Sequence, residues 1–134
     1  MNEIAETGYW NGETAHIHHV HCKELSNWIC EFLNVKISKD ESIRDLACGL
    51  GNYLKDLQEF GFTNLAGFEA DPPRHKVFNN ILKQDLTIPF TFSPKGVVIS
   101  LECGEHISKK YMNEYLDNIT NNCSNYLIMS WAIR

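Results

Sequence analysis

The stretch Ile43-Arg44-Asp45-Leu46-Ala47-Cys48-Gly49-Leu50-Gly51-Asn52 decides how this chain folds. A short apolar run leads into a Gly-x-Gly turn, and apolar residues at helical spacing follow it. Gly49 and Gly51 lack Cβ atoms where the backbone must turn tightly and where a ligand would otherwise collide with it. A strand, a glycine turn and a helix in this order indicate an α/β domain whose backbone can approach a nucleotide-like ligand.

A second acidic position supports this interpretation. Glu69 directly follows the next apolar run, Leu65–Phe68, while Asp45 belongs to the first. We expect these two acids at the ends of adjacent parallel strands, the edge where α/β sheets bind ligands. Glu69 is purely an acceptor when ionised, so it can take hydrogen bonds from both ribose hydroxyls. The sequence therefore predicts a site for a cofactor that contains a nucleoside.

Strands and helices are expected to alternate along most of the chain. From about Ala15 to Leu33, apolar residues including Trp28 and Phe32 recur at the spacing of a helix that faces the core. Further helices are predicted over Asn52–Phe60, which Gly61 ends, after Asp71-Pro72-Pro73, and around Met112, Tyr115, Leu116 and Ile119. Strands are predicted at 43–47, 65–68, 80–84, 96–101 and 126–131.

This alternation predicts an α/β fold of Rossmann-like organisation. We expect a mostly parallel sheet of about five strands, joined by right-handed crossovers, with helices on both faces. The 134 residues suit a single domain over 1–134, with an arm and helix at 1–34 and an α/β core at 43–131.

Composition limits the class of protein. With 43% hydrophobic and 22% charged residues, the chain fits a soluble globular protein. No apolar run approaches the roughly 20 residues that span a bilayer, and the first residues lack the pattern of a signal peptide. We therefore expect no membrane association and a cytoplasmic location.

The cysteines and the net charge indicate the redox compartment and the kinds of ligand that suit this chain. Five cysteines, an odd number without a C-x-x-C pair, indicate free thiols in a reducing compartment. The net charge of −5 argues against a protein that binds nucleic acid non-specifically through its phosphates. It leaves open a small or end-specific nucleic-acid substrate.

From about Ile43 to Trp131 the chain resembles the class I S-adenosylmethionine (SAM) dependent methyltransferases. Asp45–Gly51 is similar to that family's first motif, D-x-G-C-G-x-G, with Ala47 in place of the first glycine. Gln84-Asp85-Leu86 resembles the segment whose carboxylate meets the adenine amino group. The stretch 100–107 resembles the fourth motif, S-L-E-x-x-E-H. The matches follow one another in the order and at the strand positions of the family.

The resemblance implies SAM as the cofactor, transfer of its methyl group to an unidentified acceptor, and S-adenosylhomocysteine (SAH) as product. Glu69 matches the acid that binds the cofactor ribose. Backbone N–H groups near Gly49 would begin a helix, where partial positive charge suits the methionyl carboxylate. The positions expected to contact the cofactor are Asp45, Ala47, Cys48, Gly49, Gly51, Glu69, Ala70, Asp85, Leu86 and Leu101.

Glu102, Glu105 and His106 follow a predicted buried strand and are expected on the acceptor side as catalytic residues. His106 or Glu105 would be the general base. A similar E-x-x-E-H binds Mg²⁺ in small-RNA 3′-terminal 2′-O-methyltransferases and in ubiquinone-pathway O-methyltransferases, where the metal lowers the pKa of hydroxyls. Many other methyltransferases carry a similar E-H pair without metal, and we favour that interpretation. A Mg²⁺-assisted O-methyltransferase of the RNA-end or catechol type is the first alternative.

Several other features admit two interpretations. A dinucleotide dehydrogenase is disfavoured, because the third glycine of G-x-G-x-x-G falls on Leu54. Asp85 either contacts adenine or only starts the loop that follows it. Tyr9 and Trp10 either cover the site or form a packed arm. A polar helix start or a lid segment is favoured over a zinc or substrate site for the cluster of His16, His18, His19, His21 and Cys22.

The family fold normally continues past the fifth strand with two further strands that form an antiparallel edge hairpin. Here only a few residues follow Tyr126–Trp131, so we expect either a piece of a longer protein or a reduced version of the fold. The last strand would have an unpaired edge, which a homodimer or another partner would cover. A SAM-binding subunit without catalysis, completed by such a partner, is the second alternative.

Overall fold

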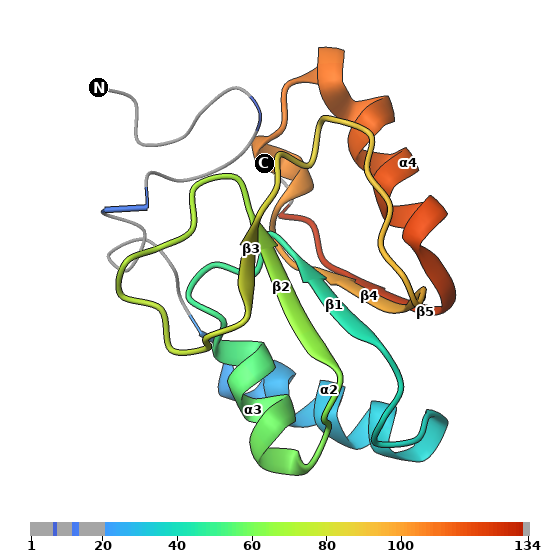
Figure 1. The fold of residues 1–134 in the computed structure, drawn as a ribbon. Coiled ribbons are helices and arrows are strands. Elements are labelled where there is room, and N and C mark those ends of the chain that lie inside the picture. The colour runs from blue at the N-terminus through green and yellow to red at the C-terminus, as the bar shows by residue number, and fades with distance from the viewer. Residues whose placement is uncertain (1–6, 8–11, 14–20, 133–134) are drawn as a thin grey trace.

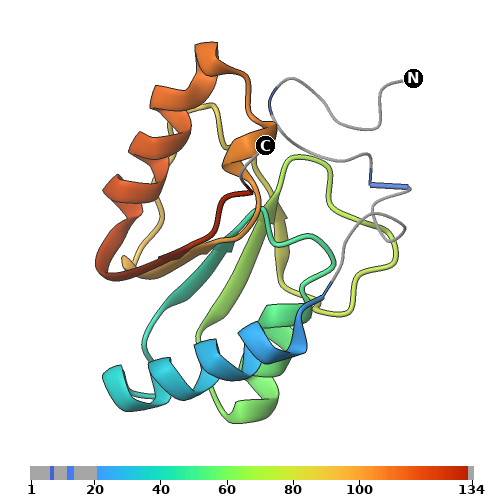
Figure 2. The ribbon, with the colours of Figure 1, turned by 180° about the vertical axis from the view of Figure 1, so that it is seen from behind.

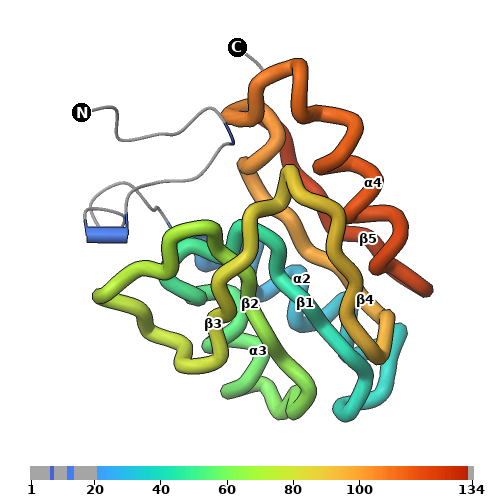
Figure 3. Tube along the Cα trace, turned by 45° about the horizontal axis from the view of Figure 1, so that its top comes forward, coloured from blue at the N-terminus to red at the C-terminus, as the bar shows by residue number. Residues whose placement is uncertain are grey.

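The computed structural model describes Thr7, Gly12, Glu13 and residues 21–132. Within these residues five strands form one sheet in the order β3-β2-β1-β4-β5, and every pairing is parallel (Figure 3). The strands are β1 (Ile43–Leu46), β2 (Leu65–Glu69), β3 (Ile81–Lys83), β4 (Gly96–Ser100) and β5 (Cys123–Met129). The predicted parallel α/β sheet is confirmed.

In the described part of the chain, three α-helices cover the two faces of this sheet. They are α2 (Lys23–Lys36), α3 (Asn52–Phe60) and α4 (Met112–Asn122). Helices α2 and α3 lie on one face and α4 lies on the other, as Figures 1 and 2 show from opposite sides. Side chains alternate along the interior strand β4: Val97 and Ile99 pack beneath α2 and α3, and Val98 packs beneath α4. Helices therefore cover both faces, as predicted.

The first described helix differs from its prediction in position and in the side that it buries. Helix α2 begins at Lys23, and residues 14–20 lie outside the part of the chain that the structure describes. Ile29 and Leu33 are buried as expected, but Trp28 is 53% exposed, so its assignment to the core is wrong. Trp28 instead stacks on the half-buried Phe32, one turn further along the same helix. The apolar stripe is wider than the surface that the sheet can cover.

The short helix predicted after Asp71-Pro72-Pro73 does not form, and residues 70–80 are bends and turns. Asp71 does not cap a helix, because its carboxylate accepts a hydrogen bond from the backbone N–H of Gly12 at 2.6 Å. The backbone N–H of Arg74 in turn donates to the Gly12 carbonyl at 3.2 Å. The loop after β2 is thus fixed by the N-terminal segment rather than by helical hydrogen bonds.

Strand β5 begins three residues before its predicted start and forms one edge of the sheet. Within the described residues its outer edge pairs with no other strand, and Leu127 is 43% exposed. All five cysteines are free thiols, as predicted. No described helix combines the length and the apolar character that crossing a membrane requires.

Candidate active site

All of the predicted site residues lie at one edge of the sheet. Because the strands are parallel, their carboxyl ends meet at this edge, where open α/β sheets bind ligands. Four segments contribute: 47–51 after β1, 69–70 at the end of β2, 85–86 after β3, and 101–106 after β4. The fold therefore gathers in space what the sequence spreads over sixty positions.

The turn after β1 needs its glycines. Gly49 and Gly51 have φ values of 59° and 88°, in the left-handed region, and Gly51 is the N-cap of α3. A Cβ on Gly51 would lie only 2.5 Å from Cβ of Phe78. The turn consequently brings the first backbone N–H groups of α3 to the sheet edge, where partial positive charge favours an anionic group.

Replacing Gly51 with alanine is expected to destabilise the protein by about 2–4 kcal/mol, combining left-handed strain with the overlap on Phe78. Gly61, the left-handed C-cap of α3, provides the matched control. A Cβ there would meet only Lys39 at 3.4 Å, so Gly61→Ala should cost only about 1–2 kcal/mol. Urea unfolding of both variants measures the difference in the free energy of unfolding. Equal losses of stability would contradict the predicted overlap between the added Cβ and Phe78.

Ala47 occupies the place of the first family glycine and has a φ of 70°. An L-residue in this conformation is strained, whereas glycine adopts it readily. Ala47→Gly should therefore stabilise the fold by about 0.5–1 kcal/mol, after allowing for the entropy of glycine in the unfolded chain. Ala66→Gly, at a buried position in β2, should have the opposite sign in the same urea experiment. A loss of stability in Ala47→Gly would refute the backbone strain inferred at Ala47.

Glu69 connects the end of β2 to the glycine turn. Its side chain is buried, and Oε1 accepts a hydrogen bond from the Gly49 N–H at 2.7 Å. Burial raises the pKa of Glu69 to about 7, although the Gly49 bond opposes the shift. On the neighbouring strand, burial and the charge of Glu69 raise the pKa of Asp45 to about 8. The structure thus brings together two buried acids and the turn, as the motif interpretation requires.

The other positions around these acids differ in exposure. The thiol of Cys48 is buried, packs close to Gly67, and has a raised pKa because of burial and the nearby Asp45. Ala70 and Leu101 are half-buried at the ends of β2 and β4. Both therefore lie where the prediction puts them, at the carboxyl edge of the sheet.

Asp85 already has partners within its own loop. Its Oδ1 accepts hydrogen bonds from the backbone N–H of Thr87 at 2.8 Å and from the Thr87 hydroxyl at 2.6 Å. This is the turn geometry expected of an acid that starts a loop. Its second oxygen, Oδ2, takes part in neither bond, and Leu86 beside it is buried. The contact between Asp85 and adenine thus stays a prediction.

The turn after β4 places Glu102, Glu105 and His106 together. Glu102 is exposed with a φ of 50°, and its pKa is raised by slight desolvation together with the hydrogen bond and charge of the neighbouring Glu105. The Glu105 side chain is only 4% exposed, and its Oε1 lies 3.7 Å from Nε2 of His106. Glu105 Oε2 is buried, and no residue of 21–132 forms a hydrogen bond with it. Within the described residues no group of three His, Cys, Asp or Glu side chains is arranged to hold a metal ion, so Mg²⁺ has no support here.

The histidine cluster is only partly described, since His16, His18 and His19 lie outside the described residues. His21 Nε2 contacts Asp56 Oδ2 at 2.8 Å, and the same oxygen accepts from the hydroxyl of Ser26. These contacts join His21, two residues before α2, and Ser26 of α2 to Asp56 of helix α3. For His21 the structure therefore shows a packing role at the start of α2.

Sequence reasoning missed a chain of buried hydroxyls beneath the site. The Tyr115 hydroxyl on α4 lies 2.7 Å from the Ser100 hydroxyl, which donates to the Leu46 carbonyl at 2.9 Å. This chain joins the ends of β1 and β4, from which the two site loops depart. The sequence predicts Tyr115 only as part of an apolar helix face, and it carries no signal for the role of the hydroxyl.

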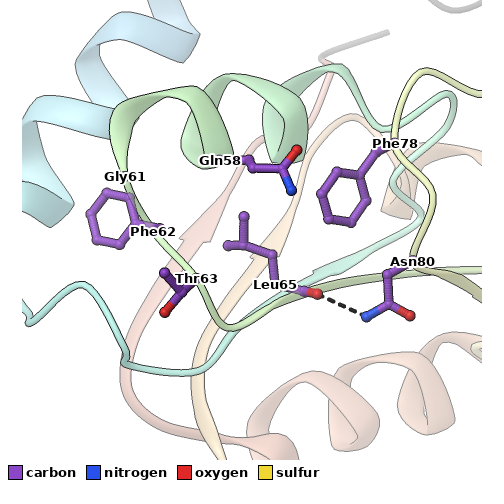
Figure 4. A pocket seen from close by; sticks show the side chains of 7 residues that line it. All are labelled: Gln58, Gly61, Phe62, Thr63, Leu65, Phe78 and Asn80. Carbon is purple, nitrogen blue, oxygen red and sulfur yellow. Dashed lines mark hydrogen bonds between the residues drawn. The ribbon is translucent and has the colours of Figure 1, made fainter.

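A pocket lies away from this edge, beside α3 and the start of β2 (Figure 4). It contains none of the predicted site residues. Two of the residues that line it are joined by a hydrogen bond, from the Asn80 side-chain amide to the Leu65 carbonyl at 2.9 Å. The residues that line it are Gln58, Gly61, Phe62, Thr63, Leu65, Phe78 and Asn80. Because it presents neither the glycine turn nor a titratable side chain, the strand edge is the better candidate site.

Comparison with solved structures identifies the architecture. A magnesium protoporphyrin IX methyltransferase from Synechocystis, solved with bound SAM, aligns over 83% of this chain with a TM-score of 0.65 and 16% identity. A SAM-dependent methyltransferase from Clostridium acetobutylicum aligns over 84% with a TM-score of 0.59 and 18% identity. The chain has the fold of a class I SAM-dependent methyltransferase. A sugar N-methyltransferase from Streptoalloteichus also aligns, over 74% with a TM-score of 0.56 and 17% identity.

The likeness is one of fold, since all three identities are low. The aligned part corresponds to 59%, 50% and 43% of the Synechocystis, Clostridium and Streptoalloteichus chains, so this chain spans about half of their length. No protein-family model and no curated protein sequence matches it.

Proposed function

We propose that this chain binds SAM at the carboxyl edge of the sheet and transfers its methyl group to an acceptor. The observation that carries the proposal is the buried carboxylate of Glu69, 2.7 Å from the N–H of Gly49, in a methyltransferase fold. One residue joins the strand end that would hold the ribose to the turn that would hold the methionyl part.

The residues present suit this cofactor chemically. Glycines keep Cβ atoms out of the turn, the first N–H groups of α3 suit a carboxylate, and Glu69 can accept from ribose hydroxyls. When bound, SAM supplies an electrophilic methyl group on a positively charged sulfonium. Asp45 and Glu69, when ionised, provide negative charge that favours a cation in this site.

The acceptor side is assigned to the turn that carries Glu102, Glu105 and His106. Glu105 and His106 are mostly buried beside one another, so either can remove a proton from an acceptor as its nucleophilic atom attacks the methyl group. The structural neighbours are named for a porphyrin and a sugar substrate, two unrelated acceptors. They therefore favour no acceptor class for this chain.

Calorimetric titration with SAH, in EDTA and in Mg²⁺, tests this proposal. Saturable one-to-one binding in EDTA supports a metal-independent cofactor site. Binding that needs Mg²⁺ would favour the Mg²⁺-assisted O-methyltransferase and assign the metal to the Glu102–His106 turn. The absence of binding in both buffers would refute the cofactor assignment.

Tritium-labelled SAM then separates an enzyme from a binding subunit. Transfer of label to small molecules, protein or RNA supports catalysis and identifies the acceptor class. Binding without transfer, together with self-association or a partner that protects β5, would favour the non-catalytic alternative. Light scattering measures self-association of the chain. Association is expected at β5, because its outer edge pairs with no other described strand.

A further inference from the structure

Two asparagines of α4, one helical turn apart, hold the segment between β3 and β4. The Asn118 amide donates to the carbonyls of Leu86 at 2.7 Å and Ile88 at 3.0 Å, and its Oδ1 accepts from the N–H of Phe90 at 3.1 Å. All of its side-chain polar atoms are therefore engaged with the backbone of that segment. Neither a helix nor a strand forms there, so the asparagine supplies the hydrogen bonds that regular structure would otherwise provide.

Asn122 repeats the arrangement further along. Its Oδ1 accepts from the N–H of Phe92 at 3.0 Å, and its amide donates to the carbonyl of Phe90 at 2.9 Å. Both asparagines are buried, at 3% and 0% exposure. The rings of Phe90 and Phe92 pack on Phe68 of β2, with centroids 5.6 Å and 5.4 Å away. The segment is thus fixed on one side by amides and on the other by aromatic packing.

Buried asparagines inside a helix are costly unless fully hydrogen-bonded, and they are poor helix formers. Packing alone would be served by apolar side chains at both positions. The amides also hold the backbone of this segment in place, starting at Leu86, which directly follows Asp85. Asp85 is itself hydrogen-bonded to Thr87, so both of these residues are held in the loop after β3, Asp85 through its side chain and Leu86 through its carbonyl.

We propose that Asn118 is a positioning residue that determines base specificity, by holding Asp85 and Leu86 where they meet the adenine of the cofactor. This inference rests on the proposed SAM site. Asn118 contacts Leu86 directly, whereas Asn122 contacts only the far end of the segment. The two positions share residue type, helix and burial, so they form a matched pair for separating base recognition from general stability.

The experiment compares two ligands and three proteins by calorimetry. SAH carries the adenine amino group, and S-inosylhomocysteine replaces that group with a carbonyl oxygen. The wild-type chain should prefer SAH by about tenfold or more. The analogue lacks the amino group that would donate a hydrogen bond to the Asp85 carboxylate. Asn118→Ala should reduce this preference to about twofold or less, and Asn122→Ala should preserve it.

Each possible outcome of this experiment supports or overturns the proposal. A reduced preference in Asn118→Ala alone supports the proposal. Equal weakening of both ligands in Asn118→Ala, or the same change of preference in Asn122→Ala, overturns it in favour of a purely structural role. Wild-type binding without preference also overturns it, while leaving the cofactor site intact. Absence of SAH binding to the wild-type chain refutes the cofactor site itself, and with it the basis of this inference.

If Asn118→Ala does not fold, Asn118→Ser provides the same comparison. Its hydroxyl keeps hydrogen-bonding capacity inside the helix but cannot span both Leu86 and Phe90 as the amide does. The preference for SAH should again fall relative to Asn122→Ser. An unchanged preference in folded Asn118→Ser would overturn the proposal.

Discussion

Glu69→Ala is expected to lower the affinity for SAH by about a hundredfold or more. The change removes an ionised acceptor for both ribose hydroxyls, and each charge-assisted hydrogen bond contributes about 1.5–3 kcal/mol. It also releases the Gly49 N–H, which Glu69 holds at 2.7 Å, so the glycine turn loses one of its hydrogen bonds to β2. Calorimetric titration of the variant with SAH measures the loss.

Two further variants give this experiment its controls. Glu59→Ala removes an exposed carboxylate from the adjacent helix α3 and should leave the affinity unchanged. Glu69→Gln keeps the shape and should show an intermediate loss, because a neutral amide accepts more weakly than a carboxylate. Thermal unfolding confirms that each variant is folded. Near-wild-type affinity in folded Glu69→Ala would refute the assignment of the ribose site.

The ligand-free protein is expected to lose stability as the pH rises from about 4 to about 8. Burial raises the pKa of Asp45 to about 8 and that of Glu69 to about 7, so both stay protonated in the folded chain after they have ionised in the unfolded chain. The folded state then binds more protons, and the free energy of unfolding falls with increasing pH. The contribution of these two acids should level off above about pH 8, where both are ionised in either state.

Urea unfolding across this pH range measures the effect. Asp45→Asn should make the profile flatter, since it removes the acid with the larger shift and the repulsion between Asp45 and Glu69. Each pKa unit that separates the folded from the unfolded state corresponds to about 1.4 kcal/mol. A stability that is constant or increases between pH 4 and pH 8 would contradict the raised pKa values of these two buried acids.

Local signals were enough to predict the parts of the fold nearest the site. The helix over Asn52–Phe60 was predicted with its observed bounds, because glycines with left-handed backbone stand immediately before and after it. Continuous apolar residues likewise marked β4 as a strand buried on both faces. The glycine turn and Glu69 meet as predicted because parallel strands bring their carboxyl ends to one edge.

Features that depend on distant partners were not predictable from local pattern. The helix expected after Asp71 fails because Gly12, far away in sequence, uses its carboxylate. Trp28 fits the helical period but lies beyond the area that the sheet covers. Asn118 and Asn122 carry no motif, and only their spacing of four on a buried helix face hints at a shared partner.

A nitrogen–proton correlation spectrum of the ¹⁵N-labelled chain, recorded during titration with SAH, tests the central claim most directly. The account predicts saturable shifts of the backbone amides of Gly49, Gly51, Glu69 and Leu86, which lie at one sheet edge but in three separate segments of the chain. An unchanged spectrum at saturating SAH would contradict the cofactor site. Shifts confined to Gln58, Thr63 and Asn80 would contradict it as well, because they would move the ligand to the pocket beside α3.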